Sequence, residues 1–240
     1  MKLVIIGTEY SGCTSLAIGI EKLAAGLLGP SIPEGAPVFH DHFKIPEIGH
    51  SVLTDKEYQE FVSLSPNIKE MFQRFMIKYH INSTLYEYPD HIMVGFHIEE
   101  AVYAPIYYGY GDNGARSNWA RSVEREMIEK SSETVLVLVT ASTETIEQRM
   151  ETSPHPRGLL KKQDIVKVTN RFKEEFDASL FLYKFMLDTT NKTPETTLKD
   201  FTNQIQPYFT DSDRMRILTR KSLLTNNDWF KLQFNWIANY

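Results

Sequence analysis

The stretch that decides the fold is Lys2-Leu-Val-Ile-Ile-Gly-Thr-Glu-Tyr-Ser-Gly-Cys-Thr14, at the start of the sequence. Its first residues, Lys2–Ile6, form an apolar run of the kind found in strands that are buried on both faces of a parallel sheet. From Thr14 onward the apolar residues recur at helical spacing, until Gly29 and Pro30 end the pattern. A strand, a glycine-bearing turn and a helix in this order are typical of a phosphate-binding unit.

The turn has the spacing G-x-x-x-x-G-K-[ST] of a phosphate-binding loop, with a cysteine in place of the lysine. Its two glycines permit backbone turns that aim successive N–H groups inward, and the following helix contributes its positive end. We therefore predict that Thr14 binds Mg²⁺ and that four residues bind phosphates through their backbone N–H groups: Gly7, Ser11, Gly12 and Cys13. We interpret Cys13 as a small residue that fits the loop rather than as a nucleophile.

Strands and helices alternate along the remainder of the chain. Further strands are predicted at 37–40, 91–96, 135–140 and 185–189. Helical patterns lie between them, and the pattern over 65–86 carries Ile68, Met71, Phe72 and Phe75 on one apolar stripe. This alternation predicts an α/β fold with a doubly wound parallel sheet of about five strands and right-handed crossovers.

We expect one domain over 1–210 and a helical C-terminal tail over 211–240. The tail carries an apolar stripe formed by Trp229, Phe230, Phe234, Trp236 and Ile237. A short helix with such a stripe must bury it. The stripe is therefore expected to pack either on the same domain or against a second copy of the chain in a homodimer.

The composition is that of a globular protein, with 42% hydrophobic and 24% charged residues. Asp and Glu (31) outnumber Lys and Arg (26), and the net charge of −5 argues against a binder of nucleic acid or of membrane surfaces. No apolar run reaches the roughly 18 residues of a membrane span, and the single cysteine excludes an intramolecular disulfide and a multi-cysteine zinc site. We expect a cytoplasmic protein without nucleic-acid or membrane partners.

The order of strand, phosphate-binding loop and helix resembles the P-loop kinases of nucleosides and nucleotides, above all the thymidylate-kinase-like group. Further segments look like that group's segment after the third strand, its fourth strand with the helix that leads to a lid, its last strand and its last helix. They are 96–103, 137–150, 186–190 and 193–198, so the resemblance extends over about 1–209. It implies an enzyme that uses ATP and Mg²⁺ to transfer a phosphoryl group to a small-molecule acceptor.

Two charged groups of that family are absent. Val94-Gly95 stands where these kinases carry Asp-Arg at the end of the third strand, and Cys13 stands at the lysine position. Because phosphoryl transfer is catalysed by positioning and charge neutralisation, this loss requires compensation. We expect Asp41 or Glu99, which follow the second and third strands, to act as the base or as a second metal anchor. An acid that only stabilises a helix N-terminus is the alternative for Glu99.

The loop alone is also similar to the phosphosulfate loop of the sulfotransferases that use 3′-phosphoadenosine 5′-phosphosulfate. In that family a small hydroxyl-bearing residue often stands at the lysine position, which suits Cys13. The arginine that the family carries after its fourth strand is absent from Thr140-Ala-Ser142. A third interpretation, which the two missing charges favour, is a catalytically silent protein that binds a nucleotide or only a partner.

Two segments carry opposite charge. Residues 149–173 hold seven Lys and Arg against two acids, and residues 152–158 have the Pro and Gly of a mobile segment. We predict a basic lid here, in which Arg149 and Arg157 clamp the transferred group. Residues 34–100 hold eleven acids against five Lys and Arg, and this balance favours a neutral or cationic acceptor over a phosphorylated one.

Overall fold

The computed structural model describes residues 1–28, 38–40, 53–87, 89–111, 114–155 and 157–226. In these ranges five parallel strands form one sheet in the order β2-β3-β1-β4-β5. The strands are β1 (Lys2–Ile6), β2 (Val38–His40), β3 (His91–Val94), β4 (Val135–Thr140) and β5 (Tyr183–Asp188). The predicted α/β fold with a doubly wound parallel sheet of about five strands is confirmed, and β1 is its central strand.

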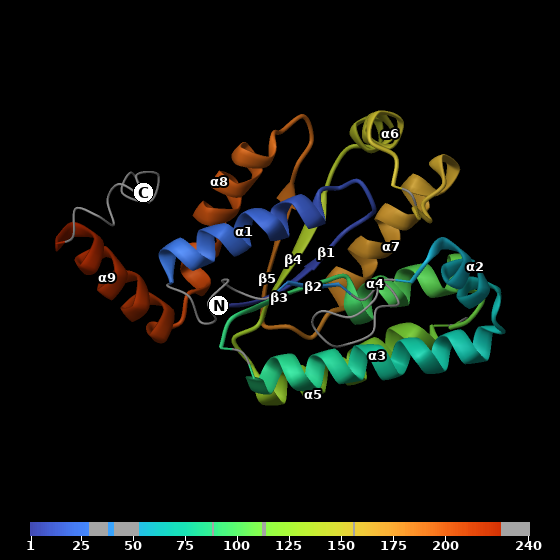
Figure 1. The fold of residues 1–240 in the computed structure, drawn as a ribbon, viewed down its shortest axis with the longest axis horizontal. Coiled ribbons are helices and arrows are strands. Elements are labelled where there is room, and N and C mark those ends of the chain that lie inside the picture. The colour runs from blue at the N-terminus through green and yellow to red at the C-terminus, as the bar shows by residue number, and fades with distance from the viewer. Residues whose placement is uncertain (29–37, 41–52, 88, 112–113, 156, 227–240) are drawn as a thin grey trace.

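Helices cover both faces of the sheet (Figure 1). One face is covered by α1 (Cys13–Leu27) and α8 (Pro194–Ile205). The other face is covered by α3 (Pro66–Glu87), α4 (Phe96–Tyr103), α5 (Ala115–Lys130) and α7 (Ile165–Ala178). The remaining elements are α2 (Asp55–Ser63), a π-helical turn η1 (Ala104–Tyr108), α6 (Thr143–Thr152), the 3₁₀ turns η2 (Lys162–Asp164) and η3 (Gln206–Tyr208), and α9 (Asp211–Asn226). In the described ranges no helix combines the length and the apolar character needed to cross a membrane.

The side chains of β1 divide between two hydrophobic cores. Leu3 and Ile5 pack on the side of α1 and α8, whereas Val4 and Ile6 pack on the side of α3, α4, α5 and α7. All four side chains are fully buried. A central parallel strand has no solvent-facing side, which explains why its sequence is a continuous apolar run rather than an alternating one.

Capping residues set the start of two helices. The Thr193 side chain accepts a hydrogen bond from the Thr196 N–H, and Pro194 takes the first position of α8, as the sequence pattern predicts. At α2, Thr54 and Glu57 form a capping box in which each side chain accepts from the other residue's backbone N–H. Short-range chemistry therefore fixes both boundaries.

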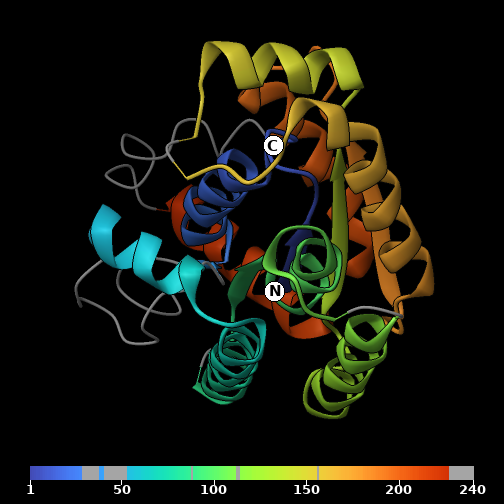
Figure 2. The ribbon, with the colours of Figure 1, turned by 90° about the vertical axis from the view of Figure 1, so that its right-hand side faces the viewer.

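Helix α3 does not bury the face that its apolar stripe indicates. Ile68, Met71 and Phe75 are 44%, 67% and 61% exposed, and only Phe72 packs partly against the core. The buried side chains of α3 instead lie on the adjacent face: Lys69, Gln73, Met76, Ile77, His80 and Ile81. The helix runs beside α5 along the lower edge of the molecule in Figure 1, and Figure 2 shows the two helices nearly end-on. A helix with apolar residues on two adjacent faces can turn only one of them to the sheet.

The connection between β3 and α4 is strained. Gly95 has φ 86° and Phe96 has φ 50°, which is unusual for an aromatic residue. The helix that follows widens into η1, and the rings of Tyr103 and Tyr107 stack across this junction at 5.6 Å. Strained backbone and π-helical turns both occur preferentially at functional sites.

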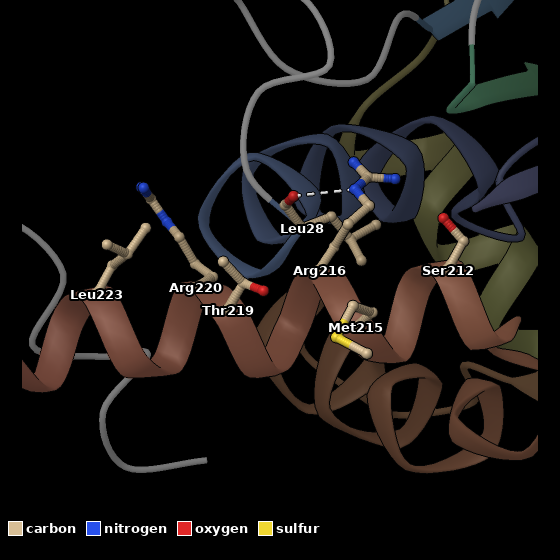
Figure 3. Close-up of a pocket in the computed structure, with 7 residues that line it drawn as sticks. All are labelled: Leu28, Ser212, Met215, Arg216, Thr219, Arg220 and Leu223. Carbon is tan, nitrogen blue, oxygen red and sulfur yellow. Dashed lines mark hydrogen bonds between the residues drawn. The ribbon is translucent and has the colours of Figure 1, made fainter.

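The helical C-terminal region is present as α9, which lies against the C-terminal end of α1. Arg216 forms a bidentate ion pair with the buried carboxylate of Asp90 and donates to the Leu28 carbonyl at 3.2 Å (Figure 3). A pocket of about 400 Å³ lies along this contact. Its lining residues are Leu28, Ser212, Met215, Arg216, Thr219, Arg220 and Leu223.

The aromatic stripe expected in the tail lies outside the described residues, which end at 226. Its burial and the homodimer contact therefore stay predictions. The same holds for the division into a domain over 1–210 and a tail over 211–240. Within the described part, Ile217 of α9 packs against Ala24 and Leu28, so the first turns of α9 already belong to the surface of the main domain.

Candidate functional site

The candidate site lies at the carboxyl edge of the sheet, where the strands end together. Ile6 leads into the glycine-bearing loop, Val94 leads into α4, and Thr140 leads into the start of α6. Thr189, directly after β5, donates its N–H to the Thr140 carbonyl at 2.8 Å. In open parallel sheets this edge is where ligands bind.

Both glycines of the loop are required by its geometry. A Cβ on Gly7 would lie 2.4 Å from the Val139 carbonyl oxygen and 2.6 Å from the Ser11 hydroxyl, so a larger residue does not fit. Gly12, at the N-cap of α1, has φ 104°. The Ser11 N–H donates to the Thr8 carbonyl at 2.9 Å, so this N–H is already paired inside the loop. Thr14 lies exposed in the first turn of α1.

Cys13 has the character of a packing residue rather than of a nucleophile. Its sulfur lies 3.4 Å from the Ser11 hydroxyl, with which it shares a hydrogen bond. Burial raises the pKa of the Cys13 thiol to about 12, so the sulfur stays protonated at neutral pH. The position that carries a positive charge in a complete G-x-x-x-x-G-K-[ST] loop is therefore neutral here.

Arg149 of α6 holds the loop from outside. Its Nη1 donates to the carbonyls of Tyr10 and Ser11, at 2.9 and 3.2 Å, and to the Thr189 hydroxyl at 3.0 Å. Its Nη2 donates to the Thr189 carbonyl at 2.9 Å. The Thr189 hydroxyl itself donates to the Ser11 carbonyl at 2.7 Å. The guanidinium thus joins the loop to the end of β5, beside Gly12. We predicted Arg149 as a clamp on the transferred group, and that role stays a prediction.

Residues 153–155 and 157–161, which we call the lid segment, lie across the loop. The Glu9 carboxylate accepts hydrogen bonds from the N–H groups of Leu159 and Leu160, at 3.0 to 3.1 Å. The ring of Tyr10 stacks on that of His155 at 4.2 Å, and the Tyr10 hydroxyl accepts the His155 N–H at 3.0 Å. The lid segment is therefore closed onto the loop.

Three basic side chains in and after the lid segment have partners in the protein. Arg157 donates to Asp55 and to the Leu53 carbonyl, both at 2.8 Å, and its guanidinium lies over the Tyr58 ring at 4.8 Å. Lys162 forms ion pairs with two glutamates of α6, and Arg171 forms ion pairs with two glutamates of its own helix. The predicted Arg157 clamp thus bridges the lid segment to α2 in this structure.

Glu99 faces the loop from α4. Burial, followed by the negative charges of Glu9 and Glu100, raises the pKa of Glu99 to about 8. The Glu99 charge also contributes to the raised pKa of the Cys13 thiol, which places the carboxylate close to the start of α1. Tyr103, one helical turn further along α4, accepts the Glu9 N–H at 3.1 Å. An acid at this depth that titrates near neutral pH can accept or donate a proton.

Glu100, next to Glu99, has a different environment. It accepts a hydrogen bond from the Tyr110 hydroxyl and forms an ion pair with the buried Arg116 at 2.6 Å. The Arg116 guanidinium lies over the Trp119 ring at 4.1 Å. A Cβ on Gly111 would overlap the Arg116 side chain, so the lack of a side chain at Gly111 makes room for this ion pair. Glu100 therefore ties α4 to α5.

Asp41, the alternative base or metal anchor, lies outside the described residues, so its role stays a prediction. Sequence spacing did not indicate Glu9, Tyr10 or Thr189, because Glu9 and Tyr10 occupy positions of the loop motif that carry no residue preference and Thr189 lies far along the chain. In the part of the chain that the structure describes, no group of three or more His, Cys, Asp or Glu side chains is placed to hold a metal ion.

No protein-family model matches this chain, and no curated protein matches it. Solved structures do resemble it. Thymidylate kinase from Candida albicans superposes with a TM-score of 0.58 at 14% identity, covering 86% of this chain and 91% of that one. Deoxyadenosine kinase from M. mycoides, solved with dCMP and dCDP bound, has a TM-score of 0.55 at 12% identity and covers 87% of this chain and 100% of that one. The structure of the same enzyme with bound dATP has a TM-score of 0.52 at 14% identity and covers 85% of this chain and 99% of that one. The chain therefore has a P-loop nucleotide-kinase-like fold.

Proposed function

We propose that this protein is a P-loop phosphotransferase that binds a nucleoside triphosphate such as ATP at residues 7–14 and transfers its terminal phosphoryl group to a small acceptor. The observation that carries the proposal is the loop itself. It lies at the carboxyl end of the central strand, it requires glycine at Gly7 and Gly12, and it opens directly into the positive end of α1. These features together favour the binding of a chain of phosphates.

The residues around the loop fit a magnesium-bound donor. The exposed hydroxyl of Thr14 is an oxygen ligand in the first turn of α1, and oxygen ligands suit Mg²⁺. When bound, Mg²⁺ would neutralise charge on the donor phosphates. Because Cys13 is neutral, the protein's own positive contribution comes from the α1 N-terminus and from Arg149, which is fixed beside Gly12.

Glu99 supplies the proton chemistry in this proposal. With a pKa of about 8, part of its population is ionised at neutral pH and can take the proton of an acceptor hydroxyl or ammonium group. Glu9 places negative charge beside the loop. This charge disfavours a phosphorylated acceptor and favours a neutral or cationic one.

Calorimetric titration tests the donor. We expect ATP to bind more tightly with Mg²⁺ than with EDTA, and Thr14→Ala to lose this difference. Ser15→Ala is the matched control, because Ser15 is the next exposed hydroxyl in the same turn. Tight, magnesium-independent binding of 3′-phosphoadenosine 5′-phosphate together with no response to ATP would instead identify a sulfotransferase.

Transfer is tested by ³¹P NMR, with ATP, Mg²⁺ and a panel of small alcohols, amines and nucleosides. We expect ADP and one phosphorylated acceptor to accumulate together. Glu99→Gln should lower the rate by roughly 10²–10⁴-fold, the usual contribution of a general base, while leaving ATP affinity unchanged. Binding of ATP without transfer to any acceptor class would favour a catalytically silent nucleotide-binding protein.

A further inference from the structure

The phosphate-binding loop carries a carboxylate at a place where negative charge opposes phosphate. Glu9 lies within the loop, and its side chain reaches the lid segment, where it accepts three hydrogen bonds from two consecutive N–H groups. The donors, Leu159 and Leu160, belong to a segment that follows α6 and lies some 150 residues away in sequence. This contact is therefore a tertiary one, between the loop and its cover.

Consecutive backbone N–H groups that converge on one anion form a nest, which is the arrangement that proteins use to bind phosphate. Gly158, just before the two donors, brings the nest close to the loop. A Cβ at this position would lie 3.2 Å from the Tyr10 hydroxyl and 3.3 Å from the Glu9 Oε2 atom. The small residue and the two N–H groups together form an anion site above the loop, and the anion that occupies it is the protein's own.

We propose that the N–H groups of Leu159 and Leu160 are a subsite for a phosphate group of the donor, and that Glu9 occupies this subsite until a nucleotide binds. This inference rests on the proposed nucleotide-dependent function. On binding, the donor phosphate takes the hydrogen bonds of the nest and the Glu9 carboxylate turns away. Glu9 is then an internal competitor, so removing its charge strengthens nucleotide binding instead of weakening it.

The remaining contacts of the lid segment fit this exchange. His155 stays stacked on Tyr10, and Arg157 stays paired with Asp55 of α2. Neither contact involves the Glu9 carboxylate. The lid segment can therefore stay above the loop while one anion replaces another, and the carboxylate keeps the nest formed in the absence of nucleotide.

The sign of the affinity change tests the proposal. In Glu9→Gln the amide oxygen still accepts the lid N–H groups, but the negative charge is lost. We expect the dissociation constant of ATP with Mg²⁺, measured by calorimetry on the full chain at low salt, to fall roughly tenfold, a typical size for such coupling. Because repulsion between charges is screened by salt, the difference should shrink at 0.5 M NaCl. Glu129→Gln, an exposed acid on α5, is the matched control and should bind like the unmodified protein.

A second measurement needs no nucleotide. Glu9→Ala removes both the charge and the acceptor, so hydrogen exchange of the peptide that contains residues 157–161 should become faster, while exchange in Glu9→Gln stays near the unmodified rate. Bound ATP should then protect the same peptide in Glu9→Ala. Tight ATP binding with equal affinity in the unmodified protein and in Glu9→Gln would overturn the subsite and leave the proposed function standing. If ATP bound neither to the unmodified protein nor to Glu9→Gln, both the subsite and the proposed function would be overturned.

Discussion

Glu99 illustrates how one partly buried acid links stability to pH. Its carboxyl group has an ordinary pKa of 4.5, and burial with two neighbouring acids raises this to about 8 in the folded protein. Between these values the folded state holds a proton that the unfolded chain has released. Its contribution to stability is therefore complete below pH 4.5 and is lost as pH rises through about 8.

Glu99→Gln should remove that loss. We expect the variant to melt at a higher temperature than the unmodified protein at pH 9, by roughly 2–4 °C for each kcal/mol recovered, and to show a much smaller difference at pH 5. Thermal melting by circular dichroism at the two pH values measures this, with Glu129→Gln as the control. Parallel melting curves for the two proteins would show that Glu99 is not held in its protonated form.

Cys13 offers a second test at this scale. Cys13→Lys restores the ammonium group of a complete phosphate-binding loop, and we expect roughly tenfold tighter binding of ATP with Mg²⁺, the size of one charge-assisted hydrogen bond. Cys13→Ser changes size and polarity without adding charge and should leave the affinity unchanged. If phosphoryl transfer occurs only in Cys13→Lys, the natural protein is catalytically silent.

Among the elements, α6 is joined to the loop and to the end of β5 through the guanidinium of Arg149. Arg149→Lys keeps the charge, but a single ammonium cannot reach the carbonyls of Tyr10, Ser11 and Thr189 together. We expect a loss of about 2 kcal/mol in the free energy of unfolding in urea, the range for hydrogen bonds to a charged group. Arg125→Lys on the exposed face of α5 should cost far less, and equal losses in the two variants would contradict this account.

The same elements show how far the sequence predicts the structure. Strand positions, the sheet and the start of α8 follow from patterns within a few residues, such as the apolar run of β1 and the pair Thr193-Pro194. The contacts of Glu9 with Leu159 do not follow from any local pattern, because only the fold brings the two residues together. The apolar stripe of α3 predicts that one face of the helix is buried, but tertiary packing buries the adjacent face. Local pattern thus identifies the loop, and only the fold identifies what covers it.

For the molecule as a whole, one contribution of α9 to stability is the ion pair between Arg216 and Asp90. Asp90 is almost completely buried before β3, and Arg216 is its bidentate partner. Arg216→Ala leaves the buried carboxylate without this partner. Because Arg216 is partly exposed, we expect the free energy of unfolding to fall by about 2 kcal/mol, which is less than for a fully buried pair. The melting temperature should fall by roughly 4–8 °C.

Arg214→Ala, two residues earlier on an exposed part of α9, is the matched control. Truncation after Thr210 should destabilise at least as much as Arg216→Ala, because it removes the same partner. Light scattering on the truncated chain also tests the predicted homodimer through the tail. A truncated chain with unchanged mass and melting temperature would show that α9 and the tail are dispensable.

The central place of β1 affects the order in which the chain can fold. Lys2 is paired with His91 and Leu3 with Val135, so β1 is synthesised before both of its neighbours in the sheet. It has no partner until residues 91–94 have been made, and its other edge stays unpaired until residues 135–138 follow. Contacts so distant in sequence form slowly. During translation an apolar strand with both edges unpaired is exposed to other chains, which is the situation in which nascent proteins need chaperones. The strand that leads into the glycine-bearing loop is thus made before both of its neighbours and is completed late.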